Sequence, residues 1–237
     1  MKSECCAHFY FVARLFQTFK PTLQITHQTL KNQLFFASRG ARVTALDNNL
    51  NALEETIKYV KSKYVKVDDD GGASIISQLC DVTQPLSIEN AINSSVKEFG
   101  TPDLLWNNAG YQGEIKPTLD YNIQDFATVM NVNVSGMFCV MQTVARKMAN
   151  VDTTDSLAST TKKNVNSEDD SVSKSKKYSI VNTASVAGLR GTPGMVAYSA
   201  SKAAVIAMTV SSAKGIFCYF ITISDADFTL VSYYSPS

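Results

Sequence analysis

Short apolar runs alternate with helical patterns along most of the chain, and this alternation is the strongest constraint on its fold. The runs are RVTAL (42–46), SIISQL (74–79), DLLW (103–106) and SIVNT (179–183), and helical patterns cover about 49–63, 85–99 and 123–148. A strand that reads as a continuous apolar run is buried on both faces, and strands that alternate with helices form parallel crossover units. The sequence therefore predicts an α/β fold with a doubly wound parallel sheet.

Composition narrows the class of protein. The chain has 237 residues, of which 45% are hydrophobic, so it is long enough for one globular domain with a substantial core. Its net charge is +1 and no basic cluster is present, which gives no reason to expect a nucleic acid as partner. The five cysteines are odd in number and scattered, which indicates reduced thiols in a cytosolic chain and predicts no metal site.

Two segments depart from the alternating pattern. Residues 151–177 are polar and contain no aromatic residue, so we expect a disordered surface insertion. The N-terminal run CCAHFYFVARLF is apolar enough to suggest a signal peptide or a membrane span. However, Glu4, His8 and Arg14 lie in or beside it and no small-residue cleavage site follows, so we expect neither, and no membrane partner.

A tyrosine and a lysine lie four positions apart in YSASK, at Tyr198 and Lys202. Residues at this spacing are neighbours on one face of a helix. In a dry cleft the ammonium favours the ionised phenol, which suits the phenol to acid and base chemistry near neutral pH. Tyr59 and Lys63 repeat the spacing in a polar, lysine-rich helix, so the spacing alone is not specific. The pair at 198 and 202 differs because it follows an apolar strand and the glycine-bearing loop SVAGLRGTPGM.

Four ordered motifs resemble the short-chain dehydrogenase/reductase family. They are NNAG at 107–110, NVSG at 133–136, Ser185 in NTASVAG, and YSASK at 198–202. Ser185 lies thirteen residues before Tyr198, as is usual in that family. The resemblance implies a Rossmann-type domain that transfers hydride between a nicotinamide cofactor and an alcohol or ketone. By this resemblance, residues 39–214 form a partial dehydrogenase domain that includes the polar insertion at 151–177. The segments 1–38 and 215–237 do not resemble the family.

The resemblance also implies a role for each catalytic residue. Tyr198 would exchange a proton with the substrate oxygen, and Lys202 would lower the pKa of the phenol and bind the nicotinamide ribose. Ser185 would hold the substrate oxygen, and Asn133 would anchor a water in a proton relay. Each of the last two has a structural alternative, since Ser185 could cap a helix and Asn133 could be a buried amide bonded to backbone.

The expected cofactor residues lie at strand ends. Asp47 closes its strand, where a carboxylate accepts from ribose hydroxyls and repels a 2′-phosphate, so we expect NAD in preference to NADP. Its alternative role is a helix cap. The resemblance places further cofactor contacts at Asp81, Val82, Asn107, Ala109 and Gly110, in addition to Tyr198 and Lys202. By the same resemblance, the partners are a small secondary alcohol or ketone and a second copy of the chain.

Both ends of the chain depart from the family pattern. The glycine-rich turn that binds pyrophosphate should lie near LQITHQT (23–29), but no glycine precedes Gly40. The first strand with its turn is therefore expected to be missing or replaced, and the next parallel strand after Lys202 is also expected to be missing, although FCYFITIS could form a strand. Two interpretations stay open: an NAD(P)-dependent oxidoreductase, or a catalytically inactive fragment or binding protein of the same lineage.

Overall fold

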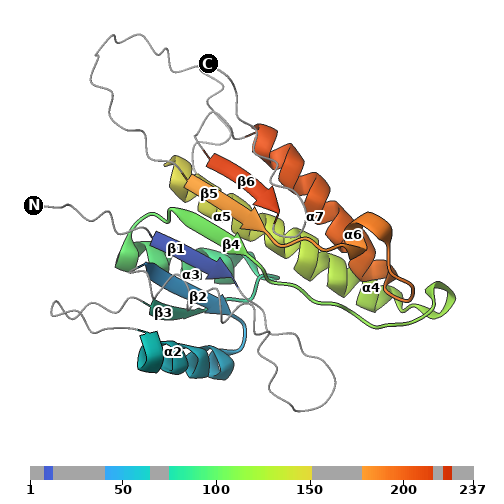
Figure 1. The fold of residues 1–237 in the computed structure, drawn as a ribbon, viewed down its shortest axis with the longest axis horizontal. Helices are drawn as coiled ribbons and strands as arrows, with labels where there is room; N and C mark the ends of the chain where they lie inside the picture. Colours follow the sequence, from blue (N-terminus) through green and yellow to red (C-terminus); the bar gives the residue numbers. More distant parts are fainter. Residues whose placement is uncertain (1–7, 13–40, 65–74, 151–177, 216–220, 226–237) are drawn as a thin grey trace, which may run out of the picture.

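A computed structural model describes residues 8–12, 41–64, 75–150, 178–215 and 221–225, and its centre is a six-stranded sheet (Figure 1). The strands are ordered β3-β2-β1-β4-β5-β6 and every neighbouring pair is parallel. Their bounds are β1 His8–Val12, β2 Arg42–Asp47, β3 Ile75–Leu79, β4 Leu104–Asn107, β5 Tyr178–Asn182 and β6 Ile221–Asp225. The prediction of a doubly wound parallel sheet is confirmed, and the polar insertion at 151–177 lies outside the described residues.

The first strand of the family pattern, which was expected to be missing or replaced, is replaced. β1 lies in the middle of the sheet, where His8–Val12 pair with β2 on one side and with β4 on the other. The family-like first strand is thus replaced by a segment that carries no family motif, because a central strand position requires backbone pairing and not a particular sequence. Residues 13–40, which include the 23–29 where the glycine-rich turn was expected, lie outside the described residues.

At the C-terminal end the expected absence of the next parallel strand is wrong, and the alternative that FCYFITIS contributes a strand is the one observed. Residues Ile221–Asp225 form β6, which pairs in parallel with β5 and supplies the strand that was expected to be missing. The aromatic and β-branched character of FCYFITIS is the sequence property that allows it, since such residues suit a pleated sheet.

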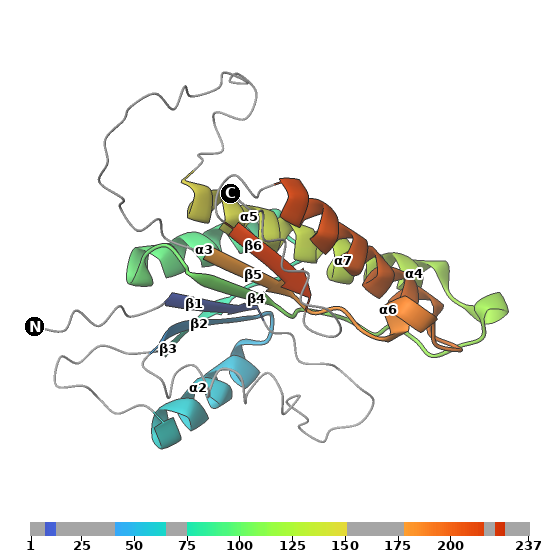
Figure 2. The ribbon, with the colours of Figure 1, turned by 45° about the horizontal axis from the view of Figure 1, so that its top comes forward.

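Helices cover both faces of the sheet, as Figure 2 shows. α2 (Leu50–Tyr64) lies against β2 and β3 on one face. On the other face, α3 (Pro85–Phe99), α5 (Met137–Ala149) and α7 (Val196–Gly215) pack over the sheet. The main hydrophobic core lies on that second face, and its fully buried members include Leu46, Ile88, Ile92, Leu105, Val140 and Ile180.

The long helix predicted at 123–148 is interrupted. It begins as α4 (Ile123–Met130), passes through a π-helical turn at Asn131–Gly136 and continues as α5. A π turn shifts the register of the backbone hydrogen bonds and is common at functional sites. The interruption contains Asn133, which the sequence analysis assigned to the site.

Candidate active site

The predicted site residues gather at the carboxyl edge of the sheet. Asp47 ends β2, Asn107 ends β4 and Asn182 ends β5. The strand order reverses between β1 and β4, because β1 continues to β2 on one side while β4 continues to β5 on the other. In an open parallel sheet, a ligand binds in the crevice beyond the carboxyl ends of the strands at such a reversal.

Tyr198 and Lys202 lie together on α7. The Lys202 Nζ atom is 5.6 Å from the centre of the Tyr198 ring, and it donates a hydrogen bond of 2.6 Å to the Thr183 carbonyl oxygen just beyond β5. Lys202 is only 3% exposed, so its ammonium is largely withdrawn from water. In contrast, Tyr59 of the second tyrosine–lysine pair is 41% exposed on α2. The lysine of the pair at 198 and 202 is therefore buried, whereas the tyrosine of the pair at 59 and 63 lies at the surface.

The Asn133 side chain connects α7 to the loop after β4. Its Oδ1 atom accepts a hydrogen bond of 2.6 Å from the Tyr111 amide, and its Nδ2 group donates to the Tyr111 carbonyl and to Ser201 Oγ, each at 2.9 Å. Ser201 immediately precedes Lys202. The side chain therefore has the contacts of a buried structural amide, which was the alternative role for this residue.

Gly110 lies between Asn133 and Lys202. A Cβ atom at this position would be 3.5 Å from Asn133 Oδ1 and 3.8 Å from Lys202 Nζ. The missing side chain leaves space beside the ammonium, on the side where the resemblance places the nicotinamide end of the cofactor.

Ser185 lies in the turn that leads from β5 to α6 (Ala187–Arg190), and it is partly exposed. Its Oγ accepts a hydrogen bond of 3.2 Å from the Ala187 amide, as a helix-capping hydroxyl does. This bond uses the oxygen as acceptor and leaves the hydroxyl hydrogen as a donor. Ser185 can therefore cap the short helix and still donate to a substrate oxygen.

The turn that carries Ser185 approaches α7 very closely. A Cβ atom on Gly188 would lie 2.6 Å from the Lys202 carbonyl carbon and 2.7 Å from the Ala203 amide nitrogen. Real Cβ atoms do not come so close to backbone, so only glycine allows this contact. The close approach holds the Ser185 turn beside the helix of Tyr198 and Lys202.

We expect Gly188→Ala to lower the free energy of unfolding by about 1 to 3 kcal/mol, because the added methyl group must push α6 away from α7. Urea unfolding measures this change. The matched control is Gly215→Ala at the end of α7, where an added Cβ meets no atom within 4 Å. An unfolding free energy for Gly188→Ala equal to that of the unmodified chain would contradict the close-contact explanation.

Two carboxylates lie near each other at the ends of β2 and β3. Asp47 is buried, and its Oδ1 accepts a bond of 2.8 Å from the Asn49 amide at the start of α2. Asp81 Oδ1 accepts from the Thr83 amide and hydroxyl, at 2.9 and 2.8 Å. Burial, followed by the negative charges of Asp81 and Asp47, raises the pKa of the Cys80 thiol between them to about 12. This end of the site is thus negatively charged and holds an unreactive thiol.

The side chains of three other predicted cofactor residues contribute mainly to packing and to bonds within the protein. Val82 and Ala109 are part of the hydrophobic core, so only their backbone can face a ligand. Asn107 is fully buried, and its Nδ2 donates to the Met137 carbonyl at 2.8 Å and to Asn182 Oδ1 at 3.1 Å. Asn107 thus ties the end of β4 to β5 and to the start of α5.

The residues at both ends of this crevice fit a nicotinamide dinucleotide. A tyrosine, a buried ammonium and a glycine-lined space lie at one end, and a pair of carboxylates suited to ribose hydroxyls lies at the other. The residues that follow β1, where the family resemblance places the pyrophosphate turn, lie outside the described residues.

Comparison with known families identifies the class of protein. The family model described as short chain dehydrogenase matches residues 34–226, a longer stretch than the motifs alone indicated. The chain belongs to the short-chain dehydrogenase/reductase family.

Individual relatives match only part of their own length. Short-chain dehydrogenase reductase 3a of Arabidopsis thaliana is 33% identical over 145 residues, which cover 61% of this chain and 48% of the relative. The 3-oxoacyl-(acyl-carrier-protein) reductase of Thermotoga maritima is 32% identical over 181 residues, which cover 76% of this chain and 60% of the relative. The chain thus spans about half to three fifths of the length of these relatives.

Solved structures agree with the fold. A NAD⁺-bound xylitol dehydrogenase superposes with a TM-score of 0.71 at 31% identity, covering 94% of this chain and 70% of that one. Levodione reductase superposes with a TM-score of 0.70 at 22% identity, over 92% and 69% of the two chains, which supports the fold alone. None of the helices in the described ranges has the length and apolar character that crossing a membrane requires.

Sequence reasoning missed several residues of the site. Thr183 contributes through its backbone carbonyl, which leaves no signal in the sequence. Ser201 lies within the motif YSASK and Tyr111 directly follows NNAG, but their roles depend on a side-chain bond across the fold. Asp125 was not singled out either, and its contacts are described below.

Proposed function

We propose that this chain interconverts a secondary alcohol and a ketone with NAD as the hydride carrier, and that Tyr198 is the acid and base. The observation that carries the proposal is the position of the Lys202 ammonium, which is buried, anchored to the Thr183 carbonyl and 5.6 Å from the Tyr198 ring. A buried positive charge beside a phenol favours the phenolate, so the proton of Tyr198 is held ready for transfer.

The proposed roles of the chain's own groups follow from their positions. When bound, the nicotinamide supplies or accepts the hydride at the substrate carbon. Tyr198 donates its phenolic proton to the ketone oxygen during reduction and takes a proton from the alcohol during oxidation. Ser185 donates its hydroxyl hydrogen to the same oxygen, and its oxygen remains bonded to the Ala187 amide.

For the relay water that Asn133 was expected to anchor, we propose a site on the backbone around this residue. Its side-chain groups are bonded to Tyr111 and Ser201, so we propose that a relay water is held by backbone carbonyls of the π turn. The side chain instead fixes the helix that carries Tyr198 and Lys202.

The negative end of the site supports NAD over NADP. Asp47 and Asp81 both raise the pKa of Cys80, so both charges act in the same small region. We propose that ribose hydroxyls bind there and that a 2′-phosphate is repelled.

Replacing Asp47 with asparagine tests this preference. Asp47→Asn keeps an acceptor for the Asn49 amide but removes the charge, and a pair of charges about 6 Å apart repels by roughly 1 to 3 kcal/mol at intermediate dielectric. We expect the ratio of the NADPH to the NADH dissociation constant to fall about tenfold or more. Ligand-observed NMR measures both constants, even at millimolar affinity.

Asp103→Asn is the control for this change, because Asp103 precedes β4 and lies at the opposite edge of the sheet. The control should leave the ratio of dissociation constants unchanged. The same ratio for Asp47→Asn as for the unmodified chain would remove the argument for NAD.

The second candidate function is a non-catalytic protein of the same lineage. The absence of glycine before Gly40 favours it, because pyrophosphate binding in this family depends on close approach of backbone amides. A test of turnover at millimolar NADH with a panel of small ketones separates the two candidates. Oxidation of NADH that depends on the ketone supports the enzyme, and its absence supports the non-catalytic protein.

A further inference from the structure

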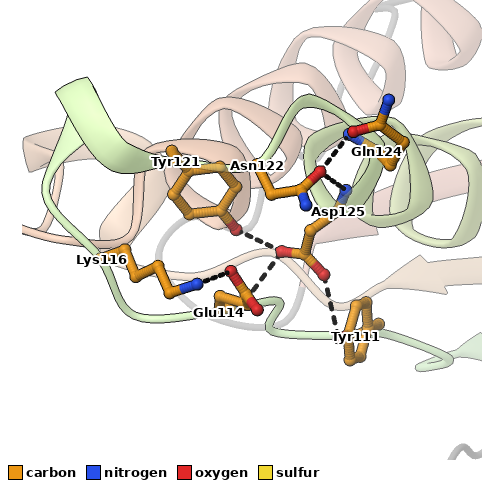
Figure 3. Close-up of polar contacts among 7 residues, drawn as sticks. All are labelled: Tyr111, Glu114, Lys116, Tyr121, Asn122, Gln124 and Asp125. Carbon is orange, nitrogen blue, oxygen red and sulfur yellow. Dashed lines mark hydrogen bonds and ion pairs between the residues drawn. The ribbon is translucent and has the colours of Figure 1, made fainter.

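The carboxylate of Asp125 is the centre of a hydrogen-bond cluster outside the catalytic set, drawn in Figure 3. Its Oδ1 accepts from the Tyr111 hydroxyl at 3.0 Å, and its Oδ2 accepts from the Tyr121 hydroxyl at 2.6 Å and from the Glu114 amide at 2.9 Å. Burial raises the pKa of Asp125, but the bonds from Tyr121, Glu114 and Tyr111 outweigh it and the pKa is lowered. Asp125 therefore stays ionised at neutral pH, and its hydrogen bonds are charge-assisted.

The loop of residues 111–121 is shaped to surround this carboxylate. Gly113 has a φ of +75°, and a Cβ atom on it would lie 2.6 Å from Tyr121 Oη and 2.8 Å from Asp125 Oδ2. Only glycine fits both the conformation and the space. The turn at Gly113 is what directs the Glu114 amide toward the carboxylate.

Tyr111 links this cluster to the candidate active site. Its hydroxyl is held by Asp125, and its backbone amide and carbonyl are both held by the Asn133 side chain. Asn133 in turn donates to Ser201 Oγ on α7. Hydrogen bonds thus connect Asp125 through Tyr111 and Asn133 to Ser201, the residue that precedes Lys202.

The loop is attached to the other side of the site as well. The Lys116 amide donates to the Gly194 carbonyl at 2.9 Å, in the turn that leads into α7. The 111–121 loop therefore spans the distance between α4 and the turn that precedes Tyr198. This position lies beside the turn that leads to Tyr198, the residue to which the proposed function assigns proton exchange with the substrate.

We propose that Asp125 is a positioning residue. It holds the 111–121 loop against α4 and keeps the Tyr111 backbone in place for its two hydrogen bonds with the Asn133 side chain. The inference rests on the proposed function, since it assigns Asp125 to the substrate side of the same site. Loss of the carboxylate removes an acceptor from two tyrosine hydroxyls and one amide, so the loop separates from α4. Tyr111 then loses the bond that holds its hydroxyl, which leaves its backbone bonds to Asn133 less well supported, and the ketone loses a wall of its binding site.

Amide hydrogen exchange of the full-length chain tests the inference without any need for turnover. Asp125→Ala should lower the protection of the Tyr111, Glu114 and Lys116 amides about tenfold or more, and leave amides in α3 unchanged. The Tyr111 amide is informative because it bonds to Asn133 and not to Asp125. Tyr111→Phe, which removes one hydroxyl, should lower the protection of the Tyr111 amide and spare that of Glu114.

Asp120→Ala is the matched control, because it removes the same charge from a nearby residue, at the end of the 111–121 loop, and Asp120 is exposed. It should change none of these amides. Unchanged protection of Tyr111 in Asp125→Ala would overturn the inference, as would an equal loss of protection throughout α3 and the sheet, which indicates general destabilisation.

Steady-state kinetics supply the second readout. Asp125→Ala should raise the KM for the ketone about tenfold or more and keep the KM for NADH within about twofold, and Asp120→Ala should change neither. Equal increases in both KM values would overturn a role on the substrate side. If the loop amides lose protection as expected but the unmodified chain has no turnover, the proposed function fails and the structural part of the inference stands.

Discussion

Tyr198→Phe should lower the turnover of NADH with a ketone substrate by about 10²- to 10⁴-fold at saturating cofactor. The phenyl ring keeps the shape of the side chain beside Lys202, but it has no proton to give to the ketone oxygen. The loss should fall on kcat, since the proton is transferred in the transition state and the ring contacts remain in the ground state. NADH absorbance at several ketone concentrations measures kcat and the KM for the ketone.

The chain provides an internal control for this substitution. Tyr59→Phe removes a hydroxyl from the other tyrosine–lysine spacing, on the exposed face of α2, and should leave turnover unchanged. If Tyr198→Phe keeps more than about a tenth of the activity, Tyr198 is not the acid and base. Turnover that survives in this variant would have to come from another proton donor.

The second large effect concerns the affinity for NADH. We expect no saturable binding at micromolar NADH, because the chain has no glycine before Gly40 to bring backbone amides to the pyrophosphate. Two lost charge-assisted hydrogen bonds at about 1.5 to 3 kcal/mol each weaken binding by roughly 3 to 6 kcal/mol. Every 1.4 kcal/mol is about tenfold, so a micromolar site becomes millimolar.

A graft tests this explanation. A family-type first strand with its glycine turn, placed over β1 and the residues that follow Val12, should tighten NADH binding by about 10²- to 10⁴-fold. The same graft with alanine in place of each glycine is the control and should bring no gain. Calorimetry or NADH fluorescence measures the binding. Micromolar binding by the unmodified chain would show that other groups hold the pyrophosphate.

The predicted strands could be found from sequence because each reads as a short apolar run between helical patterns. RVTAL, DLLW and SIVNT became β2, β4 and β5 with small shifts at their ends. β1 was missed because HFYFV lies within a longer apolar run and no glycine turn follows it. Its place in the middle of the sheet is a property of long-range pairing, which local sequence does not contain.

The site was predictable to a different degree at each residue. Tyr198 and Lys202 share a helix, so their spacing alone placed them together. The contacts of Asn133 depend on the π turn and on the loop after β4, and neither can be derived from periodicity. The Asp125 cluster depends further on the positive φ of Gly113, which brings three donors from one loop to a single carboxylate.

The central position of β1 has a consequence for how the chain reaches its native state. Residues 8–12 pair with strands that begin at Arg42 and Leu104, so the middle of the sheet is made of contacts between distant segments. Such contacts form slowly, because the entropy of closing long loops is lost before pairing repays it. Until β1 inserts, β2 and β4 each present an open edge, and open edges pair with other chains. The segment that forms β1 is therefore among the last to find its place in the sheet, and the partly folded chain is most prone to aggregate during that interval.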